Sequence, residues 1–299
     1  MNRNQASLPS SHSEATLLIN CPDRTGIVAT LSRFISDNRG NIVSVDQHSE
    51  DADQNERGGF FIRLRWTLDK FRLNHDQIVR ELKRMGKSFK WNFDLHYSNE
   101  PQHVAVFVSR EAHCLYDLLH SQVMGELHGE IRLVVSNHPQ LRSVAEHFSV
   151  PFFVIPVEKK KKREAEEIQR QLLTSYDVHL IVLAKYMQIL SPHFVRSWQN
   201  QIINVHHSFL PAFVGPKPYH QARSRGVKVI GATSHYVTEA LDQGPIIAQS
   251  VTPVSHRDGV KELIRKGRDL ERQVLSSAVR AHLDHRILTQ RNRTVVFEA

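Results

Sequence analysis

The sequence has little cysteine and no long apolar run. Its only two cysteines, Cys21 and Cys114, lie far apart in unlike contexts, which argues against a disulfide framework or a cysteine-rich metal site. No stretch approaches the roughly 18 uncharged apolar residues that a membrane-spanning helix needs, and the N-terminus lacks the apolar core of a signal peptide. We therefore expect reduced thiols, a cytoplasmic location and no membrane partner.

The charge balance is basic, with a formal net charge of +8 over 299 residues, which favours acidic partners without choosing among them. The densest basic run, residues 159–163, stands beside three glutamates and has no interleaved aromatic residues to stack on bases. A solvated loop that enters a helix fits this composition better, so we expect no nucleic-acid partner. The 19 histidines include no HExxH or similarly spaced set, and no metal site is predicted.

The first third of the chain predicts a small separate domain. Residues 1–14 are polar and aperiodic, which predicts a disordered tail. Strand and helix signals then follow in the order βαββαβ over residues 15–97. In the two helical segments, 27–35 and 75–89, apolar residues recur at three- and four-residue steps. This order predicts an antiparallel sheet with two helices on one face, a ferredoxin-like architecture.

A second domain is predicted for residues 103–299, after a linker at 98–102 whose Asn, Glu and Pro interrupt both apolar periods. Short, almost wholly apolar runs are typical of strands buried on both faces of a parallel sheet. Helical segments separate these runs, which are VAVFVSR, IRLVVSN, FFVIPV and VHLIVLA. The alternation predicts a Rossmann-like, doubly wound α/β domain that binds ligands at the carboxyl ends of its strands.

Two segments of the second domain carry motifs of known chemistry. IINVHHSFLPAFVGPKPYHQA places Asn204 and His206 at a strand end, and GATSHYVTEALDQGPIIAQ contains Asp242. They resemble the formyltetrahydrofolate-dependent formyltransferase family, in which an Asn-x-His faces an Asp that precedes a Gly-x-Ile-Ile strand. The resemblance implies that these three residues are catalytic. LAKYMQILSP resembles the family's folate pocket, and the implied substrate-binding residues are Leu183, Tyr186, Met187, Gln188, Ile189, Leu190, His207, Ser208 and Gly215.

Physical chemistry supports the same three residues as a set. Residues two apart in an extended segment share a face, so Asn204 and His206 would point into one cleft and could both donate hydrogen bonds to a developing oxyanion. A carboxylate at Asp242 would favour the charged imidazole, and it could also accept a proton from attacking water. Which of these two roles dominates stays open. Taken singly, each residue is better explained as a turn or core residue.

The segment after the first strand of the second domain indicates which acceptor takes the formyl group. Formyltransferases that use a phosphorylated glycinamide hold its phosphate with a Gly-Ser-rich loop. This chain has SREAHCLYDLL instead, with no glycine and with Glu111 where the anion would lie. The pair His206–His207 and the attached first domain resemble the deformylase branch. We therefore expect hydrolysis of 10-formyltetrahydrofolate to formate and tetrahydrofolate, without a cofactor, which balances the one-carbon pool and supplies formate for purine synthesis.

The first domain resembles the ACT family in its CPDRTG turn, the helix that follows and the Gly-Asn after it. The resemblance implies a regulatory amino-acid effector near Asp23, Gly26 and Asn41, and a homo-oligomer. An oligomerisation module without a ligand is the alternative. Two other functions also stay open for the whole chain: a phosphoribosylglycinamide formyltransferase, and a non-catalytic folate or amino-acid sensor. Formate release without an acceptor would discriminate among them.

Overall fold

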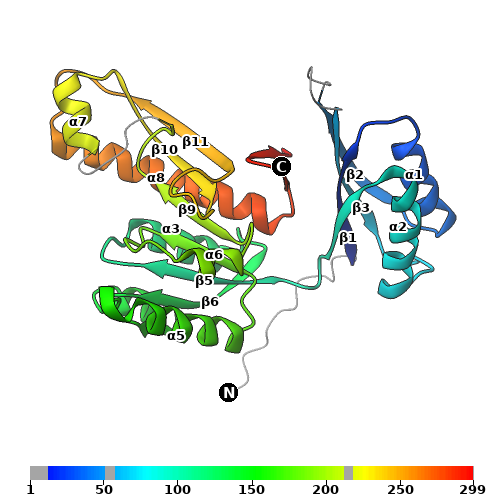
Figure 1. Ribbon diagram of the computed structural model, residues 1–299, viewed down its shortest axis with the longest axis horizontal. Helices are drawn as coiled ribbons and strands as arrows, with labels where there is room; N and C mark the ends of the chain where they lie inside the picture. The colour runs from blue at the N-terminus through cyan, green and yellow to red at the C-terminus, as the bar shows by residue number, and fades with distance from the viewer. Residues whose placement is uncertain (1–12, 51–57, 212–217, 299) are drawn as a thin grey trace. The chain divides into compact units, whose positions relative to one another are not determined.

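The computed structural model describes residues 13–50, 58–211 and 218–298, and these divide into two compact units (Figure 1). The described residues up to Pro101, together with Phe297 and Glu298, form one unit, and Gln102–Val296 belong to the other. The predicted N-terminal tail lies almost wholly outside the described residues. Strand β1 begins at Glu14, one residue before the predicted strand, and strand β5 begins at Gln102, two residues before the predicted apolar run. The domain limits at residues 97 and 103 stay predictions.

The first unit has the predicted βαββαβ order. Its elements are β1 (Glu14–Pro22), α1 (Ile27–Asp37), β2 (Ile42–Ser49), β3 (Gly59–Thr67), α2 (His75–Phe89) and β4 (Asn92–Tyr97). The strands form one sheet in the order β2-β3-β1-β4, and all three strand pairs are antiparallel. Figure 1 shows α1 and α2 together on one face of this sheet. The ferredoxin-like prediction is therefore confirmed.

Local sequence signals explain both helices of this unit. The buried residues of α1 recur at three- and four-residue steps, as the apolar period predicts, and they are Ile27, Leu31, Phe34 and Ile35. Helix α2 begins with a capping box. The backbone N–H of Gln77 donates to the Asn74 side chain at 3.0 Å, and the Asn74 N–H donates to the Gln77 side chain at 2.9 Å. These bonds fix the first residue of the helix.

The second unit is built on a seven-stranded sheet in the order β11-β10-β9-β8-β5-β6-β7. Its elements are β5 (Gln102–Val108), α3 (His113–Val123), β6 (Gly129–Ser136), α4 (Arg142–His147), β7 (Phe152–Val154), α5 (Lys162–Ser175), β8 (Leu180–Ala184), α6 (Pro192–Arg196), β9 (Ile202–His206), α7 (Pro218–Arg225), β10 (Val229–Tyr236), β11 (Ile246–Pro253), α8 (Val260–Leu283), β12 (Ile287–Gln290) and β13 (Arg293–Val296). Strands β5 to β9 are parallel, whereas β10 pairs antiparallel with both of its neighbours, β9 and β11. The parallel core was predicted, and the antiparallel extension was not.

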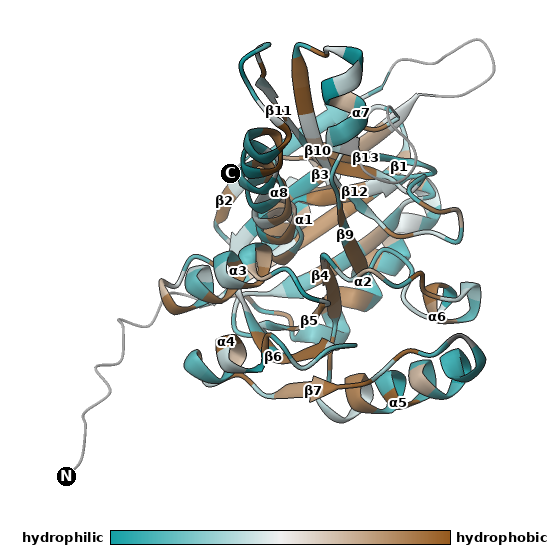
Figure 2. Cartoon of the chain, turned by 90° about the vertical axis from the view of Figure 1, so that its left-hand side faces the viewer, coloured by the Kyte–Doolittle hydropathy of each residue, from teal (hydrophilic) through white to brown (hydrophobic). Residues whose placement is uncertain are grey.

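Helices cover both faces of this sheet, which confirms the doubly wound architecture. Along β5, Val104, Val106 and Val108 pack with apolar residues of α3 and α8. The alternate residues Ala105 and Phe107 pack with those of α5 and α6 on the opposite face. Figure 2 shows β7 and β9 largely in the hydrophobic colour and α5 largely in the hydrophilic one. The carboxyl ends of the parallel strands are thus held by two cores, which makes that edge a rigid platform for a site.

Helix α8 is the longest described helix, with 24 residues. It contains Gly267, where an added Cβ would lie 1.9 Å from the hydroxyl oxygen of Tyr219. Only a glycine at this position leaves room for the tyrosine against the helix. Polar and charged side chains interrupt α8 throughout, and none of the helices in the described ranges is long and apolar enough to cross a membrane.

Candidate functional site

The predicted pair Asn204 and His206 lies on β9, where the parallel strands meet the antiparallel extension. Both side chains are partly exposed, and Val205 between them is buried, as the strand period predicts. Antiparallel pairing with β10 places His235 opposite Asn204, and Thr233 opposite His206. The register therefore brings a second histidine to the site.

Asp242 lies in the turn between β10 and β11. Its backbone has a φ of 55°, a left-handed conformation that aspartate tolerates better than most residues. The turn approaches β10 closely, because a Cβ added at Gly244 would lie 1.8 Å from the Tyr236 carbonyl oxygen. The Tyr236 N–H also donates to the Pro245 carbonyl at 2.9 Å. The glycine thus allows the turn to hold Asp242 beside the end of β9.

Four polar side chains form one connected group. The Oδ2 atom of Asp242 lies 3.3 Å from Nδ1 of His206, and its Oδ1 atom lies 3.7 Å from Nε2 of His235. The amide Nδ2 of Asn204 lies 3.3 Å from the same His235 nitrogen. The hydrogen bond from His206 and the nearby ring of His235 hold the pKa of the Asp242 carboxyl well below its usual range. Asp242 is therefore a carboxylate at neutral pH.

The two histidines of this group present different ring nitrogens. In His235, Nδ1 donates to the Tyr236 carbonyl at 2.8 Å, which leaves Nε2 facing Asn204 and Asp242. In His206, Nδ1 faces Asp242, while Nε2 is buried and has no hydrogen-bond partner among the described residues. Buried polar atoms in folded proteins are rarely left unpaired, so this nitrogen marks a place where a ligand atom would bind.

His207, the neighbour of His206, has a different electrostatic environment. The two rings stack with their centroids 4.9 Å apart, and the His207 ring lies 6.4 Å from that of Tyr219. Burial, the positive charge of Lys185 and the adjacent His206 lower the pKa of His207 to about 4. His207 is therefore neutral at pH 7, while His206 has the carboxylate of Asp242 beside it.

The predicted folate segment follows β8 and alternates between buried and exposed side chains. Leu183, Tyr186 and Leu190 are buried, Gln188 is partly buried, and Met187 and Ile189 are 67% and 63% exposed. The Met187 N–H donates to the Ser109 hydroxyl at 3.0 Å, which ties the segment to the end of β5. Two exposed apolar side chains on an anchored loop suit the face of an apolar ring.

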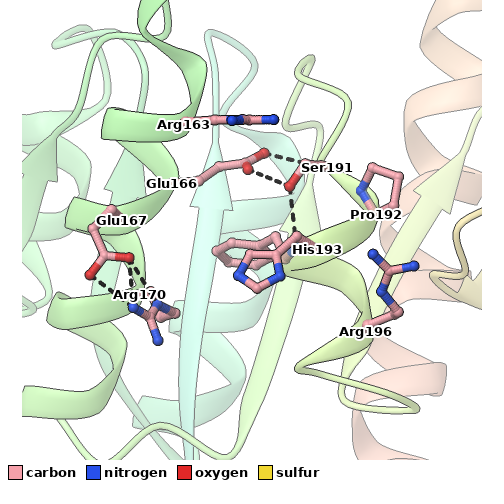
Figure 3. Close-up of a pocket in the computed structure, with 9 residues that line it drawn as sticks. Arg163, Glu166, Glu167, Arg170, Ser191, Pro192, His193 and Arg196 are labelled. Atoms are coloured by element: carbon pink, nitrogen blue, oxygen red, sulfur yellow. Dashed lines mark hydrogen bonds and ion pairs between the residues drawn. The ribbon is translucent and has the colours of Figure 1, made fainter.

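A pocket of about 510 Å³ lies between α5 and α6, where the folate segment ends. Figure 3 shows the Glu166 carboxylate accepting hydrogen bonds from the hydroxyl and backbone N–H of Ser191, at 2.5 Å and 2.8 Å. The Ser191 hydroxyl in turn caps α6 by accepting from the Phe194 N–H at 3.2 Å. None of the pocket-lining residues belongs to the group around Asp242. The pocket therefore shows how the end of the segment is fixed, not where the chemistry occurs.

The remaining predicted residues lie in different places. Ser208 follows His207 and is buried, whereas Gly215 lies outside the described residues. In the first unit, Gly26 precedes α1 and Asp23 lies in the same turn, with its N–H donating to the Gly58 carbonyl at 3.0 Å. Asn41 lies beyond the other end of this 11-residue helix. The structure therefore does not gather the three proposed effector residues at one point of a single chain.

Two groups of potential metal ligands occur in the described ranges, and both have a cation beside them. In the group of His103, Asp177 and His179, a guanidinium nitrogen of Arg132 lies 2.9 Å from His103. In the group of His113, Cys114 and Glu271, the Lys185 ammonium lies 3.0 Å from Glu271. Burial and the charge of Glu271 raise the pKa of the Cys114 thiol far above its usual range. Neither arrangement suits a metal ion.

The sequence motifs do not single out His235, Lys185 or Glu271. His235 became significant only through its register with Asn204. Glu271 did carry a signal, because it stands within the apolar stripe of α8, between the buried Gly267 and Leu275 at four-residue spacing. A carboxylate on the buried face of an amphipathic helix requires partners, and a cation is the partner that stabilises it most.

Residues 102–279 match the family model described as formyl transferase, and residues 15–65 match that of the ACT domain. The chain thus combines an ACT domain with a formyl transferase domain. A formyltetrahydrofolate deformylase of Synechocystis sp. is 50% identical over 283 residues, 95% of this chain and 98% of that one. The crystal structure of a formyltetrahydrofolate deformylase from Pseudomonas syringae pv. tomato is 43% identical, with a TM-score of 0.91 over 97% of this chain and 96% of that one. The chain belongs to the formyltetrahydrofolate deformylase family, as its motifs predict.

A second kind of solved structure shares part of this fold. Glycinamide ribonucleotide transformylase 1 from Symbiobacterium toebii is 27% identical, with a TM-score of 0.63 over 69% of this chain and 98% of that one. The same architecture therefore occurs in a protein named as a glycinamide ribonucleotide transformylase and in proteins named as deformylases. The fold alone does not decide between these activities.

Proposed function

We propose that this protein hydrolyses 10-formyltetrahydrofolate to formate and tetrahydrofolate at Asn204, His206 and Asp242. One observation carries the proposal: His206 has a carboxylate on Nδ1 and a buried, unpartnered Nε2 among the described residues. This arrangement suits a histidine that donates a hydrogen bond to a substrate oxygen, because the carboxylate favours the charged ring and the free nitrogen lies in a low-dielectric site.

The reaction needs stabilisation of a tetrahedral oxyanion and a proton for the leaving nitrogen N10. Two groups would donate hydrogen bonds to the formyl oxygen: the Nε2–H of His206 and one N–H of the Asn204 amide. The other N–H of that amide faces His235. Each such donor contributes on the order of 3 kcal/mol to the transition state. The carboxylate of Asp242 would orient the imidazole of His206 through Nδ1, and Asp242 could equally accept a proton from the attacking water.

The folate would bind along residues 183–190, with its ring against the exposed side chains of Met187 and Ile189. His207 and Ser208 would line the adjoining side of the cleft, and Gly215, outside the described residues, completes the predicted set. We propose that the reaction uses no cofactor beyond this substrate. A cytoplasmic location accords with a folate substrate and with reduced Cys21 and Cys114, both of which are free thiols.

Water is the proposed acceptor because the segment after β5 offers no anion site. The Glu111 carboxylate lies there, 3.3 Å from Arg268 and 3.6 Å from His113, so the Arg268 guanidinium already has an anionic partner. A phosphate would have to displace this carboxylate and would find no glycine backbone between residues 109 and 119.

The ACT domain would regulate the hydrolysis, because uncontrolled loss of a formyl donor would drain the one-carbon pool. We propose an amino-acid effector near Asp23 and Gly26, with Asn41 contributing from another chain of a homo-oligomer, since the three residues do not meet within one chain. The formate produced would supply purine synthesis. Light scattering with and without candidate amino acids tests the oligomer, and activity in their presence tests the regulation.

The deciding experiment incubates purified protein with 10-formyltetrahydrofolate alone and measures formate and tetrahydrofolate. Stoichiometric release of both is the expected result. A formyltransferase would release formate only weakly without its acceptor, and a folate sensor would bind without turnover. The His206→Ala variant should lose about 10²- to 10⁴-fold in kcat while tetrahydrofolate binding stays intact, because the side chain acts mainly in the transition state. A fully active variant would refute the proposed role.

A further inference from the structure

A buried ion pair lies close to His207. The Lys185 ammonium follows β8 and lies 3.0 Å from Oε1 of Glu271 on α8, with only 9% and 2% of the two side chains exposed. Nε2 of His113 lies 2.7 Å from the other carboxylate oxygen, and the Tyr219 hydroxyl donates to Oε1 at 3.4 Å. Glu271 is the most deeply buried acidic side chain in the described part of the chain. Four elements thus converge on one carboxylate.

Several features of this group are unfavourable for folding. Lys185 has a φ of 62°, in the left-handed region where a residue with a side chain is strained and glycine would be the usual choice. Gly267 interrupts the middle of α8 so that Tyr219 can reach Glu271. Burying two charges also costs more in desolvation than an apolar pair of similar size would. Backbone strain at Lys185 and the desolvation of two charges fall on the same group of residues, and this combination points to a function beyond stability.

The group continues directly into the proposed catalytic residues. Tyr219, which donates to Glu271, has its ring 6.4 Å from that of His207, and His207 stacks on His206. The ion pair therefore forms part of the wall next to the histidine that would contact the formyl oxygen. A second substrate that attacks the formyl carbon would approach along this wall.

An amine acceptor enters such a cleft as an ammonium ion and needs a buried carboxylate to hold it before it loses its proton. Glu271 could do this, but Lys185 already occupies it. We propose that Lys185 is the specificity-determining residue of this site: its ammonium takes the position that an acceptor amine would need, and water therefore receives the formyl group. This inference rests on the proposed hydrolysis at His206 and adds the reason why the acceptor is water.

The two reactions differ only in the nucleophile. With water, its oxygen bonds to the formyl carbon, the bond from that carbon to N10 breaks, and one proton passes from the water to N10. The products are formic acid, which ionises to formate, and tetrahydrofolate. With an amine, the nitrogen forms the new bond and gives its proton to N10, so that an N-formyl amide and tetrahydrofolate result.

The test measures how the formyl group is partitioned in Lys185→Gly, using the full-length protein with 10-formyltetrahydrofolate and glycinamide as the probe amine. The variant relieves the left-handed strain, opens space and leaves Glu271 without its counter-ion. We expect the ratio of N-formylglycinamide to formate, measured by mass spectrometry, to rise at least about tenfold over that of the unsubstituted protein. The double variant Lys185→Gly/Glu271→Gln should lose this gain, because no carboxylate remains to hold the ammonium.

A matched control is Asp177→Gly, which removes a charge from another left-handed residue, φ 49°, at the opposite end of β8. Its partition ratio should equal that of the unsubstituted protein. If Lys185→Gly does not fold, Lys185→Asn serves instead, because asparagine is short and tolerates a left-handed backbone. Methylammonium should then raise the Tm of whichever variant is folded and leave that of the unsubstituted protein unchanged.

The possible outcomes separate the two proposals. A folded variant at residue 185 with an unchanged partition ratio and no methylammonium effect would overturn the role of Lys185. The proposed hydrolysis fails instead if the unsubstituted protein releases no formate in the same assay. A gain of formyl transfer that persists in the double variant would show that space alone, and not the carboxylate, admits the amine, which also contradicts the proposal.

Discussion

The Nδ1 atom of His206 lies 3.3 Å from the Oδ2 atom of Asp242, although one residue ends β9 and the other lies in the turn after β10. The turn is held by the close approach of Gly244 to the backbone of Tyr236. This single contact gives His206 a charged partner on one nitrogen, while the other, buried nitrogen has no hydrogen-bond partner among the described residues.

The first prediction concerns the charge of Asp242. Asp242→Asn keeps the size of the side chain but removes the negative charge that favours the imidazolium of His206. We expect kcat for formate release to fall about 10²- to 10⁴-fold, with tetrahydrofolate binding little changed. Glu239→Gln, which alters a carboxylate of the same loop that pairs with Arg196, should stay within about twofold because surface pairs contribute little. Near-normal turnover of Asp242→Asn would contradict the proposed role.

The second prediction concerns His235, which we infer to position Asn204, because its Nε2 atom lies 3.3 Å from the amide nitrogen. His235→Phe removes the acceptor that faces the Asn204 amide and should lower kcat by about 10- to 100-fold with little change in KM, because the donor is misplaced and not lost. His235→Gln, whose side-chain oxygen can accept the same hydrogen bond, should recover much of this loss. Equal activity of the two variants would show that the bond to Asn204 does not matter.

The third prediction concerns the turn that carries Asp242. The methyl group of Gly244→Ala would lie 1.8 Å from the Tyr236 carbonyl oxygen, so the turn must move. The free energy of unfolding in urea should fall by about 1–3 kcal/mol, and kcat should fall with it as Asp242 shifts. Gly259→Ala is the matched control, because nothing lies within 4 Å of its added Cβ. A loss in the control as large as in Gly244→Ala would argue against the steric explanation.

The fourth prediction concerns pH and His207, whose pKa is about 4 in the folded protein and about 6.5 when exposed. Between these values the unfolded chain binds the proton and the folded protein does not, so stability is complete above about pH 6.5 and falls as the pH drops towards 4. The contribution amounts to about 3 kcal/mol over this window. Urea unfolding of His207→Gln between pH 7 and 4.5 should show a flatter dependence, whereas the exposed His256→Gln should follow the unsubstituted protein. Parallel curves for all three proteins would exclude His207 as the source.

Local patterns determined most of the elements. The apolar period predicts α2 at the residues where it lies, and the alternation around Val205 predicts the side on which Asn204 and His206 point. Such features depend on neighbours in the chain, so hydrophobic period and turn chemistry are sufficient to find them. The motifs also predicted the family and the expected catalytic set.

The tertiary structure decided everything that depends on which segments meet. The apolar pattern of a strand does not encode its direction, so the antiparallel pairing of β10 with β9 and β11 was not predicted. Without that register, the position of His235 opposite Asn204 was not predicted either. Lys185 and Glu271 form an ion pair across 86 residues of sequence, because strand order places the end of β8 beside α8. The sequence by itself determined the elements and the residues able to do chemistry, whereas only the packing of the sheet and its helices decided which charges became partners.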